Sequence, residues 1–171
     1  MKTNKNTLFE SIYQEHHAMV MQMCLGFVKG DKDIANDLQQ EIFISVWNHL
    51  DNFKGLSSYK TWIYKITVNS CLQYIRKQNK KQTFSITNED IETPEETSQN
   101  KVTPKTNVSN LYNAIGQLKE LDRLLIMMVL DNQDYDTIGE VIGINATNVR
   151  VKIHRIKKRL KKILEKDYHG T

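Results

Sequence analysis

The sequence predicts an all-α protein made of two small helical domains, residues 1–81 and 109–171, joined by a flexible acidic linker, residues 82–108. Apolar side chains recur at three- and four-residue spacing in both domains, and this period is lost between them. Both prolines of the chain lie in the linker, which is rich in Thr, Asn and Glu. Because each domain has its own apolar stripes, we expect each to fold alone.

The distribution of charge separates the same three segments. The first domain carries eleven Lys and Arg against seven Asp and Glu, the linker two against five, and the second domain eleven against eight. This distribution is typical of a protein in which two basic domains bind a polyanion and an acidic linker does not contact it.

Three helices are expected in the first domain, over residues 9–28, over residues 32–50, and from about residue 58 to about residue 80. Gly30 and Asp31 separate the first two helices, and Ser57 or Ser58 can cap the third. The residues expected to face inward are Phe9, Ile12, Tyr13, His16, Val20, Met23, Cys24 and Phe27, then Ile34, Leu38, Ile42, Phe43, Val46 and Trp47, and finally Trp62, Ile63, Ile66, Leu72 and Ile75.

One or two helices over residues 111–131 are expected to begin the second domain. Asp134 can cap a short helix, and Gly143 can end it, because the sharp turn that follows needs a left-handed residue. Asn145 can cap the last helix, and Gly139 would let the two final helices cross closely. The expected core stripe of the last helix is Val149, Ile153, Ile156, Leu160 and Ile163.

A short helix, a glycine turn and a longer capped helix form the helix-turn-helix arrangement, whose second helix enters the DNA major groove. Between Arg150 and Lys162 the final segment has eight Lys and Arg and no acid. Arg and Asn side chains can read base edges, and Lys side chains suit phosphates. The residues expected to contact DNA are Thr147, Asn148, Arg150, Val151, Lys152, His154 and Arg155.

Other interpretations of this basic helix stay open. A basic amphipathic helix can lie on anionic lipid or bind an acidic partner, although the bulky aromatic side chains expected opposite its polar face for membrane binding are missing. His154 can be an ordinary polar surface residue rather than a DNA contact. The charge and the helix-turn-helix pattern together favour DNA.

Catalysis is not expected, because the histidines and carboxylates form no nucleophile, metal or phosphate-loop constellation. We therefore expect no metal, no cofactor and no small-molecule substrate. Cys24 and Cys71 lie in apolar periodic segments and are expected to be buried free thiols, with a disulfide as the alternative. The N-terminus lacks an apolar signal-peptide core, and no run of eighteen apolar residues occurs, which predicts a cytoplasmic protein.

Two stretches of the first domain resemble a bacterial sigma factor. DLQQEIFISVW, residues 37–47, resembles the family pattern D-L-x-Q-E-x-F-x-x-V-W at every fixed position. FKGLSSYKTWIYKI, residues 53–66, is similar to the family's F-x-G-x-S-S-aromatic-K-T-W run, and the helices of residues 111–164 resemble the family's promoter-reading C-terminal domain. The closest resemblance is to the small two-domain type called extracytoplasmic-function (ECF) sigma factors.

The resemblance implies a dissociable specificity subunit of RNA polymerase, with the β′ and β subunits of the core enzyme as partners. Asp37, Gln40 and Glu41 stand at i, i+3 and i+4 and therefore form one patch on a helix. The matching family positions dock on the coiled coil of the largest polymerase subunits. Without the resemblance, the patch would be interpreted as a solvated acidic face.

The resemblance also assigns the two DNA contacts. The first domain is implied to capture and melt the minus-ten element, and the last helix to read double-stranded DNA at the minus-thirty-five element. Unstacked bases can be held by a polar loop beside an aromatic helix, and basic residues can hold the phosphates. The residues expected at the minus-ten DNA are Asn52, Phe53, Lys54, Ser57, Ser58, Lys60, Lys65, Asn69, Arg76 and Lys77. Trp62 is expected to be a core residue that supports the loop.

Members of this family are commonly held by an anti-sigma factor, so such a partner is expected as well. Two other functions remain as alternatives. A helix-turn-helix repressor or activator with an N-terminal dimerisation domain would bind a palindromic operator without polymerase. A helical protein that sequesters a partner would show no salt-dependent DNA binding.

Overall fold

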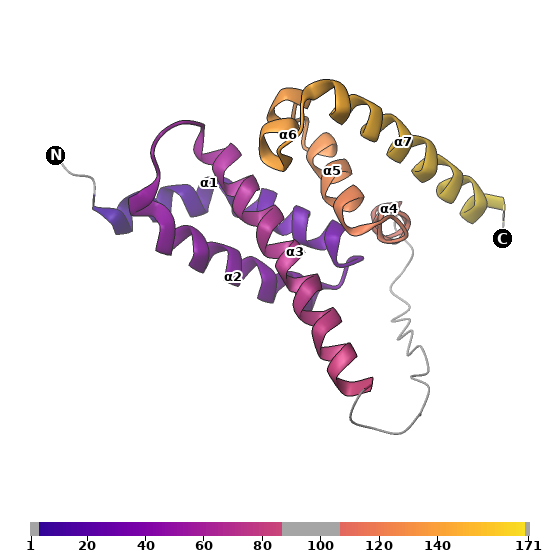
Figure 1. The fold of residues 1–171 in the computed structure, drawn as a ribbon, viewed down its shortest axis with the longest axis horizontal. Helices are drawn as coiled ribbons and strands as arrows, with labels where there is room; N and C mark the ends of the chain where they lie inside the picture. The colour runs from indigo at the N-terminus through magenta and orange to yellow at the C-terminus, as the bar shows by residue number, and fades with distance from the viewer. Residues whose placement is uncertain (1–3, 87–106, 170–171) are drawn as a thin grey trace.

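The computed structural model describes residues 4–86 and 107–169, and every regular element in these two segments is a helix (Figure 1). The all-α prediction is therefore confirmed. The helices are α1 (Lys5–Phe27), α2 (Lys32–His49), the short 3₁₀ helix η1 (Leu50–Asn52), α3 (Tyr59–Ile86), α4 (Asn107–Gly116), α5 (Glu120–Leu130), α6 (Tyr135–Ile142) and α7 (Ala146–His169). Nowhere in the described segments is a helix both long and apolar enough to cross a membrane.

Polar side chains fix where the helices begin. Asp31 caps α2, since its Oδ1 accepts hydrogen bonds from the backbone N–H groups of Asp33 and Ile34, both at 3.0 Å. Ser58, rather than Ser57, caps α3, because its Oγ accepts from the N–H of Thr61 at 3.1 Å.

The caps predicted for the second domain are confirmed. Asp134 Oδ1 accepts a hydrogen bond from the N–H of Thr137 at 2.7 Å. Hydrogen bonds from the backbone and side chain of Thr137 lower the pKa of Asp134. Asn145 Oδ1 accepts from the N–H of Asn148 at 2.8 Å, and Gly143 adopts the expected left-handed conformation with φ of 78°. Local signals therefore define the helix-turn-helix correctly.

Gly139 permits the close crossing of α6 and α7. A Cβ atom built on this residue would lie 2.4 Å from the carbonyl oxygen of Ile144, a backbone atom that cannot rotate away. The expected role of Gly139 as a small residue at the crossing is confirmed. Below it, Val149, Ile153, Ile156 and Leu160 are buried as predicted, and Ile163 is half-buried.

The central helix α3 is buried over a wider surface than the sequence predicts. Tyr64 and Val68 belong to the core although the expected apolar face omits them. The reason is tertiary, because α3 lies between α1 and α2 on one side and α5 and α6 on the other. Trp62 is only half-buried, beside Phe53 with 5.1 Å between ring centroids, so the expected core position is corrected to the margin of the core.

Cys24 and Cys71 are buried free thiols, as predicted. They come from α1 and α3 and are neighbours in the core. A hydrogen bond with the Cys24 thiol, together with burial, raises the pKa of Cys71.

Both helices that flank the predicted linker extend into it. α3 continues to Ile86 and α4 begins at Asn107, so residues 82–86 and 107–108 are helical. The extension of α3 is understandable because no Gly or Pro occurs after residue 81 until Pro94. The rest of the predicted linker, residues 87–106, lies outside the described residues.

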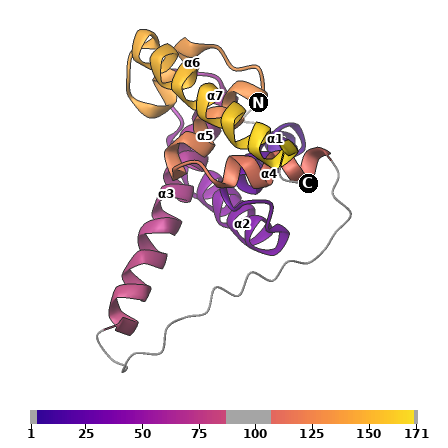
Figure 2. The ribbon, with the colours of Figure 1, turned by 90° about the vertical axis from the view of Figure 1, so that its right-hand side faces the viewer.

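The two helical domains share one continuous apolar core rather than the two separate cores expected from the sequence. α4 and α5 pack against α1, and α5 and α6 pack against α3, whereas α2 lies on the side away from the second domain (Figures 1 and 2). Gly26 of α1 makes room for Met127 of α5, since a Cβ on Gly26 would lie 2.4 Å from the Met127 sulfur. The buried Arg123 donates from Nη1 to the carbonyl oxygen of Phe27 at 3.0 Å, which ties α5 to the end of α1.

Stability should decrease as the pH falls below about 6.5, because His16 is buried in α1. Burial lowers the pKa of His16 below its ordinary 6.5, Glu15 opposes the shift, and Lys60 adds to it. The unfolded chain therefore takes up a proton at a higher pH than the folded chain, which favours unfolding on acidification. We expect His16→Gln to reduce the loss of unfolding free energy between about pH 7.5 and about pH 5.5, measured by chemical denaturation. The exposed His154→Gln variant is the control, and an equal loss in both variants would contradict the assignment.

Candidate functional site

The polar patch predicted on α2 faces solvent. Asp37, Gln40 and Glu41 are all exposed, and no described Lys or Arg lies within ion-pair distance of either acid. α2 also lies away from the second domain. The patch is therefore accessible while the two domains are packed against each other, as they are in this structure.

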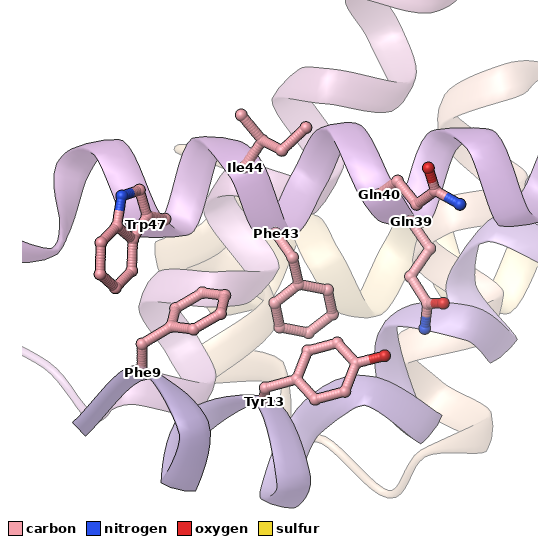
Figure 3. A pocket seen from close by; sticks show the side chains of 7 residues that line it. All are labelled: Phe9, Tyr13, Gln39, Gln40, Phe43, Ile44 and Trp47. Carbon is pink, nitrogen blue, oxygen red and sulfur yellow. The ribbon is translucent and has the colours of Figure 1, made fainter. Parts of the chain in front are cut away.

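A shallow apolar groove of about 430 Å³ lies beside this patch, between α1 and α2 (Figure 3). Its lining residues are Phe9, Tyr13, Gln39, Gln40, Phe43, Ile44 and Trp47. Ile44 is 60% exposed and stands seven residues after Asp37, so it continues the face of Asp37, Gln40 and Glu41. The sequence interpretation missed Ile44. Its position as an apolar residue on an otherwise polar helix face could have indicated a role in binding. Tyr13, expected to face inward, is instead exposed at the rim of the groove.

The loop before α3 is supported by stacked aromatic rings. Phe53 stacks on Tyr59 with 4.4 Å between ring centroids, so Phe53 is half-buried rather than free to meet DNA. The other predicted loop residues differ from one another in their exposure to solvent. Asn52, Lys54 and Ser58 are exposed, and Ser57 is half-buried. Leu56, which the sequence interpretation omitted, is 88% exposed at the loop tip beside Gly55, whose φ is 69°.

The predicted contacts on α3 divide into two groups. Asn69, Arg76 and Lys77 are exposed, and the C-terminal half of α3 projects away from the other helices in both views (Figures 1 and 2). Lys60 and Lys65 are half-buried and paired with the second domain, at 3.0 Å from Asp131 Oδ2 and 2.9 Å from Glu140 Oε1. The structure therefore presents the first group to solvent and covers the second.

All seven residues predicted to contact DNA from the last helix are exposed, outside the buried stripe of α7. The guanidinium carbon of Arg150 lies 5.8 Å from the centroid of the Tyr135 ring, a cation–π distance. Tyr135 begins α6, and the sequence interpretation did not include it; an aromatic residue at the first position of the helix-turn-helix was the signal. Farther along α7, Lys157, Lys158, Lys161 and Lys162 are exposed as well. This surface suits a polyanion in a groove.

Two family models match the chain, one in each helical domain. Residues 12–81 match the model described as Sigma-70 region 2, and residues 109–160 match Sigma-70, region 4. The chain is 26% identical over 163 residues to the ECF RNA polymerase sigma factor SigX of Bacillus subtilis (strain 168). This alignment covers 92% of this chain and 84% of the relative. The chain is also 28% identical over 160 residues to the RNA polymerase sigma factor YlaC of the same organism, with 92% of each chain covered.

Two solved structures share the fold. One is the sigma factor RpoE in complex with the anti-sigma factor NepR from Bartonella quintana, with a TM-score of 0.74, 18% identity, and 92% of this chain and 96% of that chain covered. The other is CnrH in complex with the cytosolic domain of CnrY, with a TM-score of 0.65, 19% identity, and 96% and 91% covered. The chain belongs to the ECF group of the sigma-70 family, whose members bind core RNA polymerase and direct promoter-specific transcription.

Proposed function

We propose that the two helical domains of this sigma factor have different roles in transcription initiation. Residues 1–81 bind the β′ and β subunits of core polymerase through Asp37, Gln40 and Glu41 and melt the minus-ten element. Residues 109–171 read the minus-thirty-five element with α7. The observation that carries the proposal is the exposure of the α2 patch inside the region 2 match and of the first turns of α7 inside the region 4 match.

The groove between α1 and α2 adds an apolar component to the proposed polymerase contact. Apolar anchors that become buried at an interface contribute affinity in addition to that of the paired charged and polar groups, which also set orientation and association rate. Ile44 lies next to Gln40 in the groove lining, so a partner that contacts the patch would also cover Ile44. We therefore include Ile44 in the proposed polymerase surface.

The loop before α3 and the start of α3 are proposed to hold the melted minus-ten strand. The Phe53, Tyr59 and Trp62 rings support the loop from beneath, so that its exposed polar groups are held in a fixed arrangement. Asn52, Lys54 and Ser58 can then bind unstacked base edges and backbone. Asn69, Arg76 and Lys77 continue the positive surface along α3 toward phosphates.

An anti-sigma factor is also proposed as a partner. Two solved proteins that share this fold were found in complex with a second protein, RpoE with the anti-sigma factor NepR and CnrH with the cytosolic domain of CnrY. Because polymerase works in the bacterial cytoplasm, we propose that the protein acts there.

Run-off transcription with purified core polymerase tests the proposal. The template pool carries random sequence in place of the two promoter elements, and active templates are selected by sequencing their transcripts. We expect this protein to yield transcripts from templates that share two elements at a fixed spacing. A protein that binds a palindromic site as a dimer and yields no transcript would be a helix-turn-helix repressor instead.

Arg150 and Lys157 should affect promoter use in different ways. Arg150 is exposed on the first turns of α7, and its planar fork can pair with guanine O6 and N7. Lys157 lies about two turns farther on, where a straight helix leaves the groove. Arg150→Ala should cost roughly 1–3 kcal/mol and relax the preference at one base pair, whereas Lys157→Ala should weaken all promoters about equally.

The measurement is transcription from the selected promoter library at two salt concentrations. Lys157→Ala should flatten the salt dependence by about one unit at most. A loss of preference in Lys157→Ala with none in Arg150→Ala would show that α7 docks in the opposite direction or is not the reader.

A further inference from the structure

Val151 is an apolar residue in the middle of a polar helix face. It is 45% exposed, and no other large apolar side chain is exposed among residues 146–167 of α7. The buried stripe of α7 includes Val149 and Ile153, each two residues away. Because a helix turns by about 100° per residue, Val151 lies about 200° from each of them around the helix axis, on the side opposite the core. Val151 therefore stands on the part of α7 that would lie deepest in a groove.

The four residues that surround Val151 on the helix surface are all polar. Side chains three and four residues apart are neighbours on a helix, and at Val151 these neighbours are Thr147, Asn148, His154 and Arg155. All four are exposed. Their donors and acceptors can bind base edges or phosphates, whereas Val151 offers neither a donor nor an acceptor. A ligand that covers this face is most complementary if it presents an apolar group to Val151.

The backbone at Val151 is held in place by contacts on the other side of α7. Asn145 caps the helix by accepting from the N–H of Asn148 at 2.8 Å, and Val149 and Ile153 are buried. A β-branched side chain in a helix has one strongly preferred χ1 rotamer, so both methyl groups of Val151 have fixed directions. Contact with a ligand would therefore cost little side-chain entropy, unlike contact through a long basic side chain.

The free protein does not benefit from an apolar residue at position 151. Val is a weaker helix former than Ala, Lys or Arg, and nearly half of this side chain stays in water. Single exposed apolar residues are common on protein surfaces, and Val108 of α4, at 60% exposure, is another example. Val151 differs from Val108 because it stands at the centre of the surface proposed to contact DNA.

The base edges in the major groove carry donors, acceptors and one apolar group, the C5-methyl group of thymine. We propose that Val151 reads this methyl group, so that one base pair of the minus-thirty-five element is a T·A pair whose thymine faces Val151. This inference rests on the proposed role of α7 as the reader of that element. It adds to that role a preference for thymine that does not depend on hydrogen bonding.

Deoxyuridine substitution tests the contact, because uracil pairs as thymine does and lacks only the C5-methyl group. Promoters are selected from random templates by run-off transcription with core polymerase, and each thymine of the minus-thirty-five element is then replaced singly by deoxyuridine. The measured quantity is the template concentration that gives half-maximal transcription. We expect one replacement to raise this concentration about fourfold, which is the effect of losing one buried methyl group.

Two matched valine variants show whether Val151 causes the effect. Val151→Ser and Val108→Ser make the same exchange at exposed helix positions, so both should keep the fold, which circular dichroism checks. The penalty for deoxyuridine should disappear in Val151→Ser and persist in Val108→Ser. At the same base pair, the unmodified protein should use a template with 5-methylcytosine better than one with cytosine, and Val151→Ser should use both equally.

The inference would be overturned if no thymine of the minus-thirty-five element showed a penalty, or if the penalty were the same in Val151→Ser and Val108→Ser. The proposed role of α7 would fail instead if Arg150→Ala and Val151→Ser both left the preference unchanged at every base pair of that element.

Discussion

Replacing Asp37, Gln40 and Glu41 with alanine should weaken binding to core polymerase by roughly a hundredfold, because interface charges and polar groups that lose their partners carry a large cost. The fold should be unaffected, because all three side chains are exposed and their truncation removes no atom from the core. Affinity for core polymerase is measured by fluorescence titration, and the free energy of unfolding by chemical denaturation. We expect the free energy of unfolding to change by less than about 0.5 kcal/mol for each substitution.

The first domain offers a matched control for this triple variant. Glu10, Gln14 and Glu15 are also two acids and one glutamine, all exposed, on α1 rather than α2. Alanine at these three positions removes the same charge and should leave polymerase binding within about threefold of the unmodified protein. The assignment would be wrong if both triple variants lost binding equally, or if the α2 variant lost binding only because it unfolds.

Gly139→Val should destabilise the helix-turn-helix by about 2–4 kcal/mol. The new Cβ would meet the carbonyl oxygen of Ile144, and relief of that contact must move the turn that begins at Gly143. The turn sets the angle between α6 and α7, so a change there should also disturb the position of Arg150. Both chemical denaturation and transcription from the selected promoters should report the loss.

Asp136→Val is the control for placing a β-branched residue in α6. Asp136 is exposed in the first turn, and Asp and Val have similar helix propensities, so this change loses mainly a favourable charge near the helix N-terminus, about 1 kcal/mol or less. A cost for Gly139→Val no larger than for Asp136→Val would show that the crossing has room for a side chain.

Features that depend on neighbours in sequence could be predicted well. Asp134, Gly143 and Asn145 were predicted from their residue types and spacing, because a cap or a left-handed turn is satisfied within four residues. The apolar stripe of α7 was predicted for the same reason, since helical periodicity determines which residues share a face.

Features that depend on distant partners could not be predicted. Tyr64 bonds to a residue 67 positions away, and Lys65 to one 75 positions away. The family resemblance and its positive charge mark Lys65 as a phosphate contact, and nothing local shows that a carboxylate pairs with it. The residue types of the candidate site come from the sequence, while their exposure depends on a contact between domains that the sequence pattern does not encode.

The buried thiol pair makes alkylation kinetics a measure of how the first domain opens. A thiol reacts with iodoacetamide as the thiolate, and both burial and the raised pKa of Cys71 suppress that form in the folded protein. Labelling of Cys24 and Cys71 must then wait for the helices around them to separate, so its rate reports the free energy of that opening. Cysteines introduced at exposed positions would react much faster, which allows surface labels to be attached while both native cysteines remain in place.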